Sequence, residues 1–363
     1  KDPRLLRTQP RTAVWSGRLT DAATLLGHVT PLSPEEVTLA SDLALALSHQ
    51  GQGALSEGVY RRLVDEGHAT PELRERYGWW LSEAGRYADA WRILRPVARG
   101  SLSARGRELQ SRSAFWAGDY EAAVPLLDQW LADEPSDVDG WRDLAEAGRQ
   151  RKDPTTELRA LDRYVALTNP DPETAARRAS LLDRAGRAEA ALGAYAAVLI
   201  RAPDRVTTRR DYGIVLERSG RIEEAIREYG TVWEAEVKRD PTSKANGDLA
   251  LIVARLARKT RRPADALTWY ERALSAPMSV PPGSLSVEVA QTEIESGRAD
   301  AAHKRMTAAV RSGATDDGLA FAAYAAAAAN DPGAAAGHLE SLASRRRLTE
   351  EQLRWQASLY RLA

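Results

Sequence analysis

Two stretches of this chain carry the same spacing of residues 34 positions apart, and that spacing limits the folds available to it. Residues 184–203 read RAGRAEAALGAYAAVLIRAP, and residues 218–233 read RSGRIEEAIREYGTVW. In both, a glycine follows an arginine by two positions, an alanine comes five residues after that glycine, and a tyrosine comes four residues after the alanine. A fixed period in this range is typical of a solenoid of stacked helical units.

The glycine position of this pattern, which we call the anchor, recurs along the whole chain at intervals of 33 to 41 residues. The anchors are Gly17, Gly51, Gly85, Gly118, Lys152, Gly186, Gly220, Arg261, Gly297 and Asn330. Five residues after each anchor the residue is small, except at Glu157, and four residues further on it is bulky and apolar. The pattern predicts helix-turn-helix units in which the small residue lets the two helices approach and the bulky residue packs between neighbouring units.

This pattern resembles the tetratricopeptide repeat, in which Trp, Leu-Gly, Tyr, Ala, Phe and Pro stand at fixed offsets. Trp141 with Leu144, or Tyr212 and Gly213 with Leu216, occupy the slots expected in the first helix of a unit. The resemblance covers nearly the whole chain. It implies an all-α fold, an α-solenoid that forms a right-handed superhelix of about ten repeats, with the first helices lining the concave face.

The predicted organisation is a single array over residues 1–363. Residues 1–275 hold repeats one to eight, residues 276–283 (APMSVPPG) a Pro-rich linker or loop, residues 284–348 repeats nine and ten, and residues 349–363 a capping helix. Thr349 and Gln352 have the spacing of a capping box that opens this last helix, in which Leu353, Trp355 and Leu359 would seal the end of the array.

Two segments depart from the regular period. The interval from Gly220 to Arg261 is long, so we expect lengthened helices or a protruding loop near residues 236–247. The prolines of residues 276–283 exclude a continuous helix there. That segment is either a linker that changes the curvature of the solenoid or a loop that binds a partner.

Charge and cysteine content disfavour several classes of function. The 51 basic residues are balanced by 51 acidic ones, which argues against a protein that coats nucleic acid or an acidic membrane. With no cysteine the chain has no disulfide, Cys metal site or thiol nucleophile. No apolar run is long enough to span a bilayer, so we expect no membrane contact by this segment. The chain lacks an initial Met and an apolar leader, and we interpret it as a piece of a longer or processed protein.

Sequence signals for catalysis, a cofactor or a metal are weak. The five histidines show no helix-face metal spacing and fall in different repeats or turns. The glycines mark turns at the repeat period and do not form a phosphate-binding loop, and no serine lies in a G-x-S-x-G motif. We therefore predict a protein that is not an enzyme, with no catalytic, cofactor-binding or metal-binding residues.

Two groups of residues are candidates for a partner-binding groove on the first helices. The first is a basic ladder, and the second is a pair of tryptophans with Phe115 beside them. The candidates are Trp79, Arg112, Trp116, Arg142, Arg177, Arg184, Arg210, Arg218, Arg255 and Lys259. The ladder would bind an acidic peptide or an anionic polymer through bidentate contacts. The alternative is structural, because acidic residues lie among these cations and cations are favoured at helix C-termini.

The aromatic candidates have two interpretations as well. Trp79 and Trp116, with Phe115, map to groove-facing positions, where exposed tryptophan would bind a protein or stack on carbohydrate. Packing in the core is the alternative for these residues. Core packing is the simpler interpretation for four other aromatic residues, namely Tyr77, Trp91, Trp130 and Trp141.

These features favour a non-catalytic scaffold that recruits another protein. A narrower resemblance is to the periplasmic tetratricopeptide regions of bacterial exopolysaccharide export proteins of the Pel and cellulose type. It implies a periplasmic location, a role in exopolysaccharide secretion and biofilm formation, and a polysaccharide deacetylase, hydrolase or synthase component as partner, or the polysaccharide itself. The alternatives are a cytoplasmic regulatory or sensor module that binds a peptide or small ligand, and direct glycan binding, which predicts exposed Trp79 and Trp116 rings.

Overall fold

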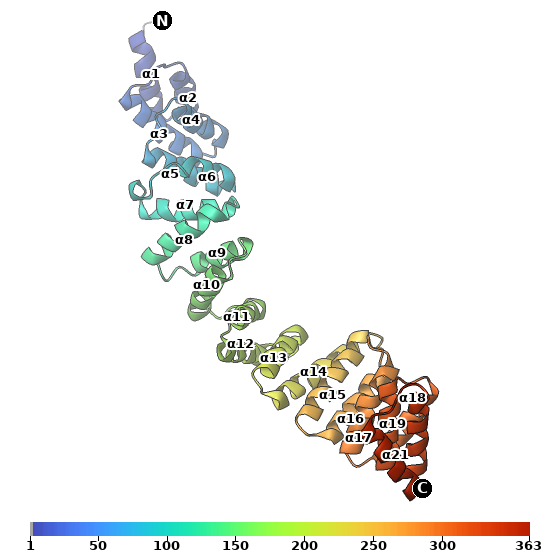
Figure 1. The fold of residues 1–363 in the computed structure, drawn as a ribbon. Helices are drawn as coiled ribbons and strands as arrows, with labels where there is room; N and C mark the ends of the chain where they lie inside the picture. Colours follow the sequence, from blue (N-terminus) through green and yellow to red (C-terminus); the bar gives the residue numbers. More distant parts are fainter. Residues whose placement is uncertain (1–2) are drawn as a thin grey trace. The chain divides into compact units, whose positions relative to one another are not determined.

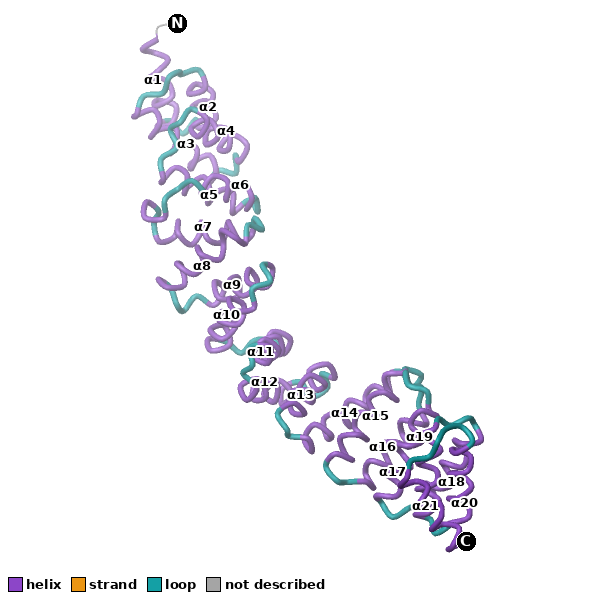
Figure 2. The backbone as a smooth tube through the Cα atoms, in the orientation of Figure 1, coloured by secondary structure: helices purple, strands orange, loops and turns teal. Residues whose placement is uncertain are grey.

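The computed structural model describes residues 3–363, with side chains from Arg7 onward. Within these residues the chain forms 21 α-helices and two short 3₁₀ helices (Figures 1 and 2). The chain divides into two compact units, one ending at Asp171 and the other running from Pro172 to Ala363. Each unit is a run of antiparallel helix pairs, so the predicted all-α solenoid of helix pairs is confirmed within each. The grouping of all repeats into a single array stays a prediction.

In the first unit the odd-numbered helices are the first members of the pairs and the even-numbered helices are the second members. The helices are α1 (Pro3–Trp15), α2 (Leu19–Gly27), α3 (Pro34–His49), α4 (Gly53–Asp65), α5 (Pro71–Glu83), α6 (Tyr87–Leu94), η1 (Arg99–Ser101), α7 (Ala104–Trp116), α8 (Tyr120–Asp133), α9 (Val138–Gln150) and α10 (Pro154–Leu167).

The second unit continues the same numbering and ends in an unpaired helix. Its helices are α11 (Pro172–Arg184), α12 (Ala188–Arg201), α13 (Val206–Arg218), α14 (Ile222–Arg239), α15 (Lys244–Lys259), α16 (Pro263–Ser275), η2 (Pro282–Leu285), α17 (Ser286–Glu295), α18 (Ala299–Arg311), α19 (Asp316–Ala328), α20 (Pro332–Ala343) and α21 (Glu350–Leu362).

The turn inside each pair is set by the anchor. Every anchor has a positive φ, between 71° and 79° at the glycines and 56° at Lys152, 57° at Arg261 and 61° at Asn330. Glycine adopts this left-handed conformation freely, whereas another residue loses about 1 kcal/mol or more by doing so. The register predicted from the spacing of the anchors is therefore confirmed.

The second helices carry the predicted packing residues. All the residues five positions after an anchor are buried, as are all those nine positions after it; Ala191 and Tyr195, for example, are 0% and 2% exposed. Buried Tyr and Leu side chains at the second of these positions fill the space between helices. The four aromatic residues assigned to the core from the sequence, Tyr77, Trp91, Trp130 and Trp141, are also buried.

Glu157, the exception at the small position, is accommodated by a glycine on the facing helix. A Cβ atom added at Gly148 of α9 would lie 2.7 Å from the backbone nitrogen of Glu157. The absence of a side chain at Gly148 therefore lets α10 approach α9 closely, and Glu157 itself is buried. Gly148 lies four residues before its anchor, in the slot that Leu216 fills before Gly220.

The long interval between Gly220 and Arg261 is taken up by lengthened helices. Of the two predictions for this interval, lengthened helices or a protruding loop, the first is confirmed. Helix α14 has 18 residues and α15 has 16, joined by a short turn at residues 240–243. The segment after α16 is a loop, also as expected, and it packs on the array. Met278 is buried, Gly247 donates its N–H to the Pro277 carbonyl at 3.2 Å, and Asp248 accepts hydrogen bonds from Ser279 at 2.8 and 2.6 Å.

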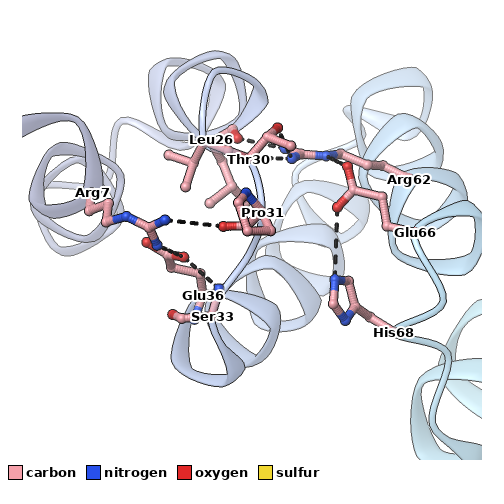
Figure 3. A network of polar contacts seen from close by, with 10 residues as sticks. Arg7, Leu26, Thr30, Pro31, Ser33, Glu36, Arg62, Glu66 and His68 are labelled. Carbon is pink, nitrogen blue, oxygen red and sulfur yellow. Dashed lines mark hydrogen bonds and ion pairs between the residues drawn. The ribbon is translucent and has the colours of Figure 1, made fainter. Parts of the chain in front are cut away.

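Polar contacts hold the connection between α2 and α3 (Figure 3). The Arg62 guanidinium donates to the carbonyls of Leu26, at 2.6 Å, and Val29, and it pairs with Glu66 at 2.7 Å. On the other side of the same loop Arg7 pairs with Glu36 at 2.8 Å. These contacts fix the loop from the two helix pairs that flank it.

The end of the chain is closed by α21. Its capping box is present, with Thr349 accepting from the Gln352 backbone N–H and the Gln352 side chain accepting from Thr349. Leu359 is buried against α20, and Trp355 packs beside it. Leu353 was expected to seal this end with them, but it is 50% exposed.

Candidate partner-binding face

The candidate residues lie on the first helices, at positions two, six or nine residues before an anchor and at their neighbours. Residues with this spacing lie one above another on the same side of a helix. Contacts between successive first helices confirm that these positions adjoin, since Arg76 of α5 pairs with Asp42 of α3 at 3.0 Å. We call this side the first-helix face of each unit.

Trp79 and Trp116 differ in their exposure. The Trp79 ring on α5 is half-buried, and the Arg105 guanidinium of α7 stacks on it, 3.6 Å from the ring centroid. Trp116, the last residue of α7, is 54% exposed and lies beside Tyr87, with ring centroids 5.7 Å apart. Exposure of both rings was expected for glycan binding; only Trp116 is largely exposed.

Phe115 corrects one expectation. It was placed with the groove-facing aromatics, but its side chain is only 8% exposed. The reason is that consecutive helical residues point about 100° apart, so Phe115 turns inward while Trp116 faces outward. Phe115 packs edge-on against Tyr120, the first residue of α8, with ring centroids 5.9 Å apart.

A cavity of about 530 Å³ opens on the first-helix face at Trp79. Leu45 of α3 and Leu109 of α7 line it with Trp79, and Arg76 and Glu72 supply charges. Trp116 is not among its lining residues. The cavity combines an aromatic ring, two aliphatic side chains and charges of both signs, a composition suited to a partner's side chain.

Arg112 and Arg142 of the first unit are both tied to carboxylates. Arg112 of α7 lies 3.2 Å from Glu108 and 3.2 Å from Asp137. Burial opposes ionisation of Asp137, but hydrogen bonds from Trp130 and the Gly140 backbone and the charge of Arg112 hold its pKa below the usual value. Arg142 lies 2.9 Å from Asp139 and 3.5 Å from Asp143.

The basic ladder of the second unit is partly neutralised. Arg218 pairs with Asp183 of the preceding first helix, and Arg210 lies 3.3 Å from Glu236. Arg177 is exposed on α11. Arg184 ends α11 as an exposed side chain with no ion pair among the described residues. Opposite charges spaced by one repeat period are the sequence signal for the pairing of Arg218 with Asp183, which lie 35 residues apart.

The structure brings two ladder residues together at the end of α15. Arg255 and Lys259 line one cavity of about 620 Å³, together with Arg258, Arg261 and two glutamates of α17. Arg255 binds Glu288 in a bidentate pair at 2.8 and 2.9 Å. Lys259 has no ion pair among the described residues. Trp79 lines the separate cavity on α3, α5 and α7 described above.

A histidine pair escaped the sequence analysis. His303 of α18 and His338 of α20 have ring centroids 6.4 Å apart, and the His303 Nε2 lies 3.7 Å from Asp331. Burial, and then the neighbouring His303, lowers the pKa of His338. Residues 3–363 contain no group of three or more side chains placed to hold a metal ion. The two histidines lie 35 residues apart, about one repeat period, on successive second helices. This spacing is the sequence signal that predicts their contact, because equivalent positions of neighbouring repeats adjoin.

No helix among the described residues is both long enough and apolar enough to cross a membrane. Paired helices, left-handed anchor turns and buried residues at the same two positions of each second helix define an α-solenoid protein built from helix-turn-helix repeats. Residues 109–172 and 177–243 match the tetratricopeptide repeat family. Over these two segments the chain consists of tetratricopeptide repeats.

Among curated proteins, the chain is similar to cellulose synthase 1 operon protein C of Komagataeibacter xylinus. The two are 26% identical over 180 residues, which are 48% of this chain and 13% of that protein. The chain therefore spans about an eighth of the length of this relative.

Solved structures that match part of the chain include two tetratricopeptide repeat proteins. YrrB, described as having an unusual peptide-binding site, is 16% identical, with 48% of this chain and 91% of that one covered and a TM-score of 0.37. A protein from Parabacteroides merdae is 14% identical, with 70% and 98% covered and a TM-score of 0.34.

Proposed function

We propose that the chain is a non-catalytic scaffold that binds a partner protein through its first-helix face, within a bacterial exopolysaccharide secretion apparatus. The partner is a polysaccharide-modifying enzyme or synthase component, and the location is the periplasm. Arrays of helix pairs present long surfaces on which recognition needs no chemistry. The similarity over 180 residues to a cellulose synthase operon protein supports the secretion context.

The observation that carries the proposal is the cavity at Trp79. Its walls come from three successive first helices and from residues 100–103 of the α6–α7 connection, so a bound segment would contact α3, α5 and α7 at once. Aromatic anchors in pockets contribute most of the binding energy at many protein interfaces. The Arg105 guanidinium keeps the Trp79 ring in a defined orientation, which reduces the entropy lost on binding.

The test is capture of partners from the source organism. The immobilised chain is exposed separately to periplasmic and cytoplasmic fractions, and bound proteins are identified by mass spectrometry. We expect a polysaccharide deacetylase, hydrolase or synthase component from the periplasmic fraction. Trp79→Ala should weaken this capture about tenfold or more, since a hot-spot tryptophan is lost.

Trp15→Ala is the matched control for this test. Trp15 also lies under an arginine, with Arg11 5.1 Å from its ring centroid, but it is 76% exposed and outside the Trp79 cavity. Trp15 stands at a position of the first-helix face on α1, so unchanged capture on its loss would assign binding to the Trp79 cavity and not to the face in general. Capture of cytoplasmic regulators instead would favour a sensor module, and equal capture by the Trp79 variant and the unmodified chain would reject the proposed face.

A further inference from the structure

The cavity at the end of α15 is rich in cations. Its charged lining residues are Arg255, Arg258, Lys259 and Arg261, with Glu288 and Glu295 of α17 opposite them. Two positive charges in this lining are not matched by a carboxylate. At about 620 Å³ the cavity has the size of a small-molecule site.

Two of the arginines are held in fixed positions by the glutamates. Arg255 uses Nε and Nη2 to bind Glu288, and Arg258 uses the same two atoms to bind Glu295 at 3.1 and 2.9 Å. The Tyr270 hydroxyl donates a hydrogen bond to Glu288 at 2.7 Å and thereby also holds the carboxylate that binds Arg255. A guanidinium has five N–H donors, so each arginine keeps its Nη1 donors for another acceptor.

The other two cations have no such carboxylate. Lys259 and Arg261 are both exposed, and neither forms an ion pair within residues 7–363. Lys259 is the last residue of α15, and Arg261 is the anchor with a φ of 57° two residues later. The turn therefore places both cations on the rim of the cavity whose wall carries the two fixed guanidinium groups.

We propose that this cavity binds a small oxyanion with two or more negative charges, of about the size of a diphosphate. The anion would accept charge-assisted hydrogen bonds from Arg255 and Arg258 and would neutralise Lys259 and Arg261. Because the glutamates already order the arginines, binding would cost little side-chain entropy. The inference stands independently of the partner protein proposed above, whose cavity lies in the other unit.

The test is isothermal titration calorimetry of the full chain with inorganic pyrophosphate in about 50 mM NaCl, where screening is weak. We expect saturable binding that weakens as the salt concentration rises. The double variant Lys259→Gln with Arg261→Asn should bind about tenfold more weakly or worse, because two charged contacts are lost. Asparagine suits the left-handed turn, as Asn330 shows at the equivalent anchor.

The matched control changes the same two slots outside the cavity. Arg184→Gln with Lys152→Asn removes an exposed cation at the end of a first helix and a cation at an anchor with a φ of 56°. This variant should bind pyrophosphate like the unmodified chain. An equal loss of affinity in both double variants would show that the total charge of the chain, and not this cavity, determines binding, and it would overturn the proposal. Circular dichroism of each variant would verify that it is folded.

Two further ligands separate the sources of the anion. Citrate binding that responds to the same variants would support recognition by charge. If binding does not saturate by about 10 mM pyrophosphate, the affinity is very weak and the proposal is overturned. Tighter binding of a hexaglutamate peptide than of pyrophosphate would overturn it too, since the cavity would then accept a protein segment.

Discussion

Asp143 on α9 is a buried carboxylate whose ionisation works against folding. It is only 3% exposed, and burial raises its pKa to about 6 although Arg142 and Arg112 lie nearby and lower it. The protonated form is therefore favoured in the folded chain over a wider pH range than in the unfolded chain, where an aspartic acid has a pKa of about 3.9.

This difference predicts the pH dependence of stability. Between the two pKa values the folded chain keeps a proton that the unfolded chain releases, so the free energy of unfolding falls as the pH rises from about 4 to about 6. The loss from this residue would be as much as about 3 kcal/mol. Asp143→Asn should remove it, so that the variant gains stability relative to the unmodified chain at neutral pH but not at about pH 4. Urea unfolding at several pH values measures this difference.

Asp139→Asn is the control for Asp143. Both carboxylates lie on α9 and both contact Arg142, but the Asp139 side chain is 55% exposed. If the Asp139 variant showed the same pH-dependent gain, the effect would come from loss of charge near Arg142 and not from burial.

Gly148 makes a second residue-scale prediction, because its contact is with backbone. Gly148→Ala would place a methyl group 2.7 Å from the Glu157 nitrogen, and the two helices would have to separate. We expect a loss of about 1–3 kcal/mol in the free energy of unfolding. Gly58→Ala on α4, where the added methyl meets nothing within 4 Å, should instead stabilise by about 0.5–1 kcal/mol. Denaturant unfolding of both variants tests the close approach, which equal effects would contradict.

At this scale the sequence predicted backbone roles better than ion pairs. The left-handed anchors follow from spacing, because glycine recurs where the turn requires it. The pairing of Arg218 with Asp183 depends on side chains from different repeats, and a cation at a helix end is explained equally well by the helix dipole. Compensation between Gly148 and Glu157 was missed because it depends on the contact of two facing helices, which the spacing of the anchors does not show.

Among the elements, α21 is secured by its cap. Thr349→Ala removes the side-chain acceptor of the capping box and should destabilise α21 by about 0.5–2 kcal/mol. Hydrogen exchange of the α21 amides should therefore become faster, while exchange in α11 to α13 stays the same. Thr268→Ala on α16 is the control, since its exposed hydroxyl only donates to the Ala264 carbonyl within the helix. Unchanged exchange in α21 would show that its packing on α20, not the cap, sets its stability.

The helices themselves were largely predictable, and the connections less so. Apolar periodicity and anchors located the helix pairs, and the prediction that the Pro-rich segment forms no continuous helix is confirmed, since only its last two residues enter the short 3₁₀ helix η2. Its packing on α15 through Asp248 and Gly247 was not predictable, because hydrogen bonds to a loop leave no period in the sequence. The contact of His303 with His338 was missed because the histidines were compared only within single helices.

On the scale of the whole chain, ion pairs between residues 30 to 37 positions apart join neighbouring helix pairs. Such pairs include Glu121 with Arg151 at 2.9 Å and Asp128 with Arg159 at 2.7 Å in the first unit, and Arg258 with Glu295 at 2.9 Å in the second. Each contact reaches only the next repeat, as do the buried apolar side chains. Stability is then a sum over repeats and their nearest-neighbour interfaces.

This locality predicts how far a defect spreads. Ala225 is fully buried, so Ala225→Trp would overpack α14 and cost about 1–3 kcal/mol or more. Hydrogen exchange should accelerate in α13 to α16 and stay unchanged in α3 to α7. Ala197→Trp, at an exposed site of α12, should change neither. Faster exchange throughout the chain would show that the repeats unfold together.

The left-handed anchors carry a consequence for how such a chain evolves. The turn requires a left-handed backbone conformation at one position in each repeat. Lys152, Arg261 and Asn330 adopt it, which shows that glycine is replaceable even there. Most other positions can be substituted as long as the size and polarity of the side chain are kept. Sequence identity between related chains would then fall while the repeat period is retained. Gene duplication can then add or remove whole repeats, and the length of the array becomes a trait that selection can adjust without redesigning a core.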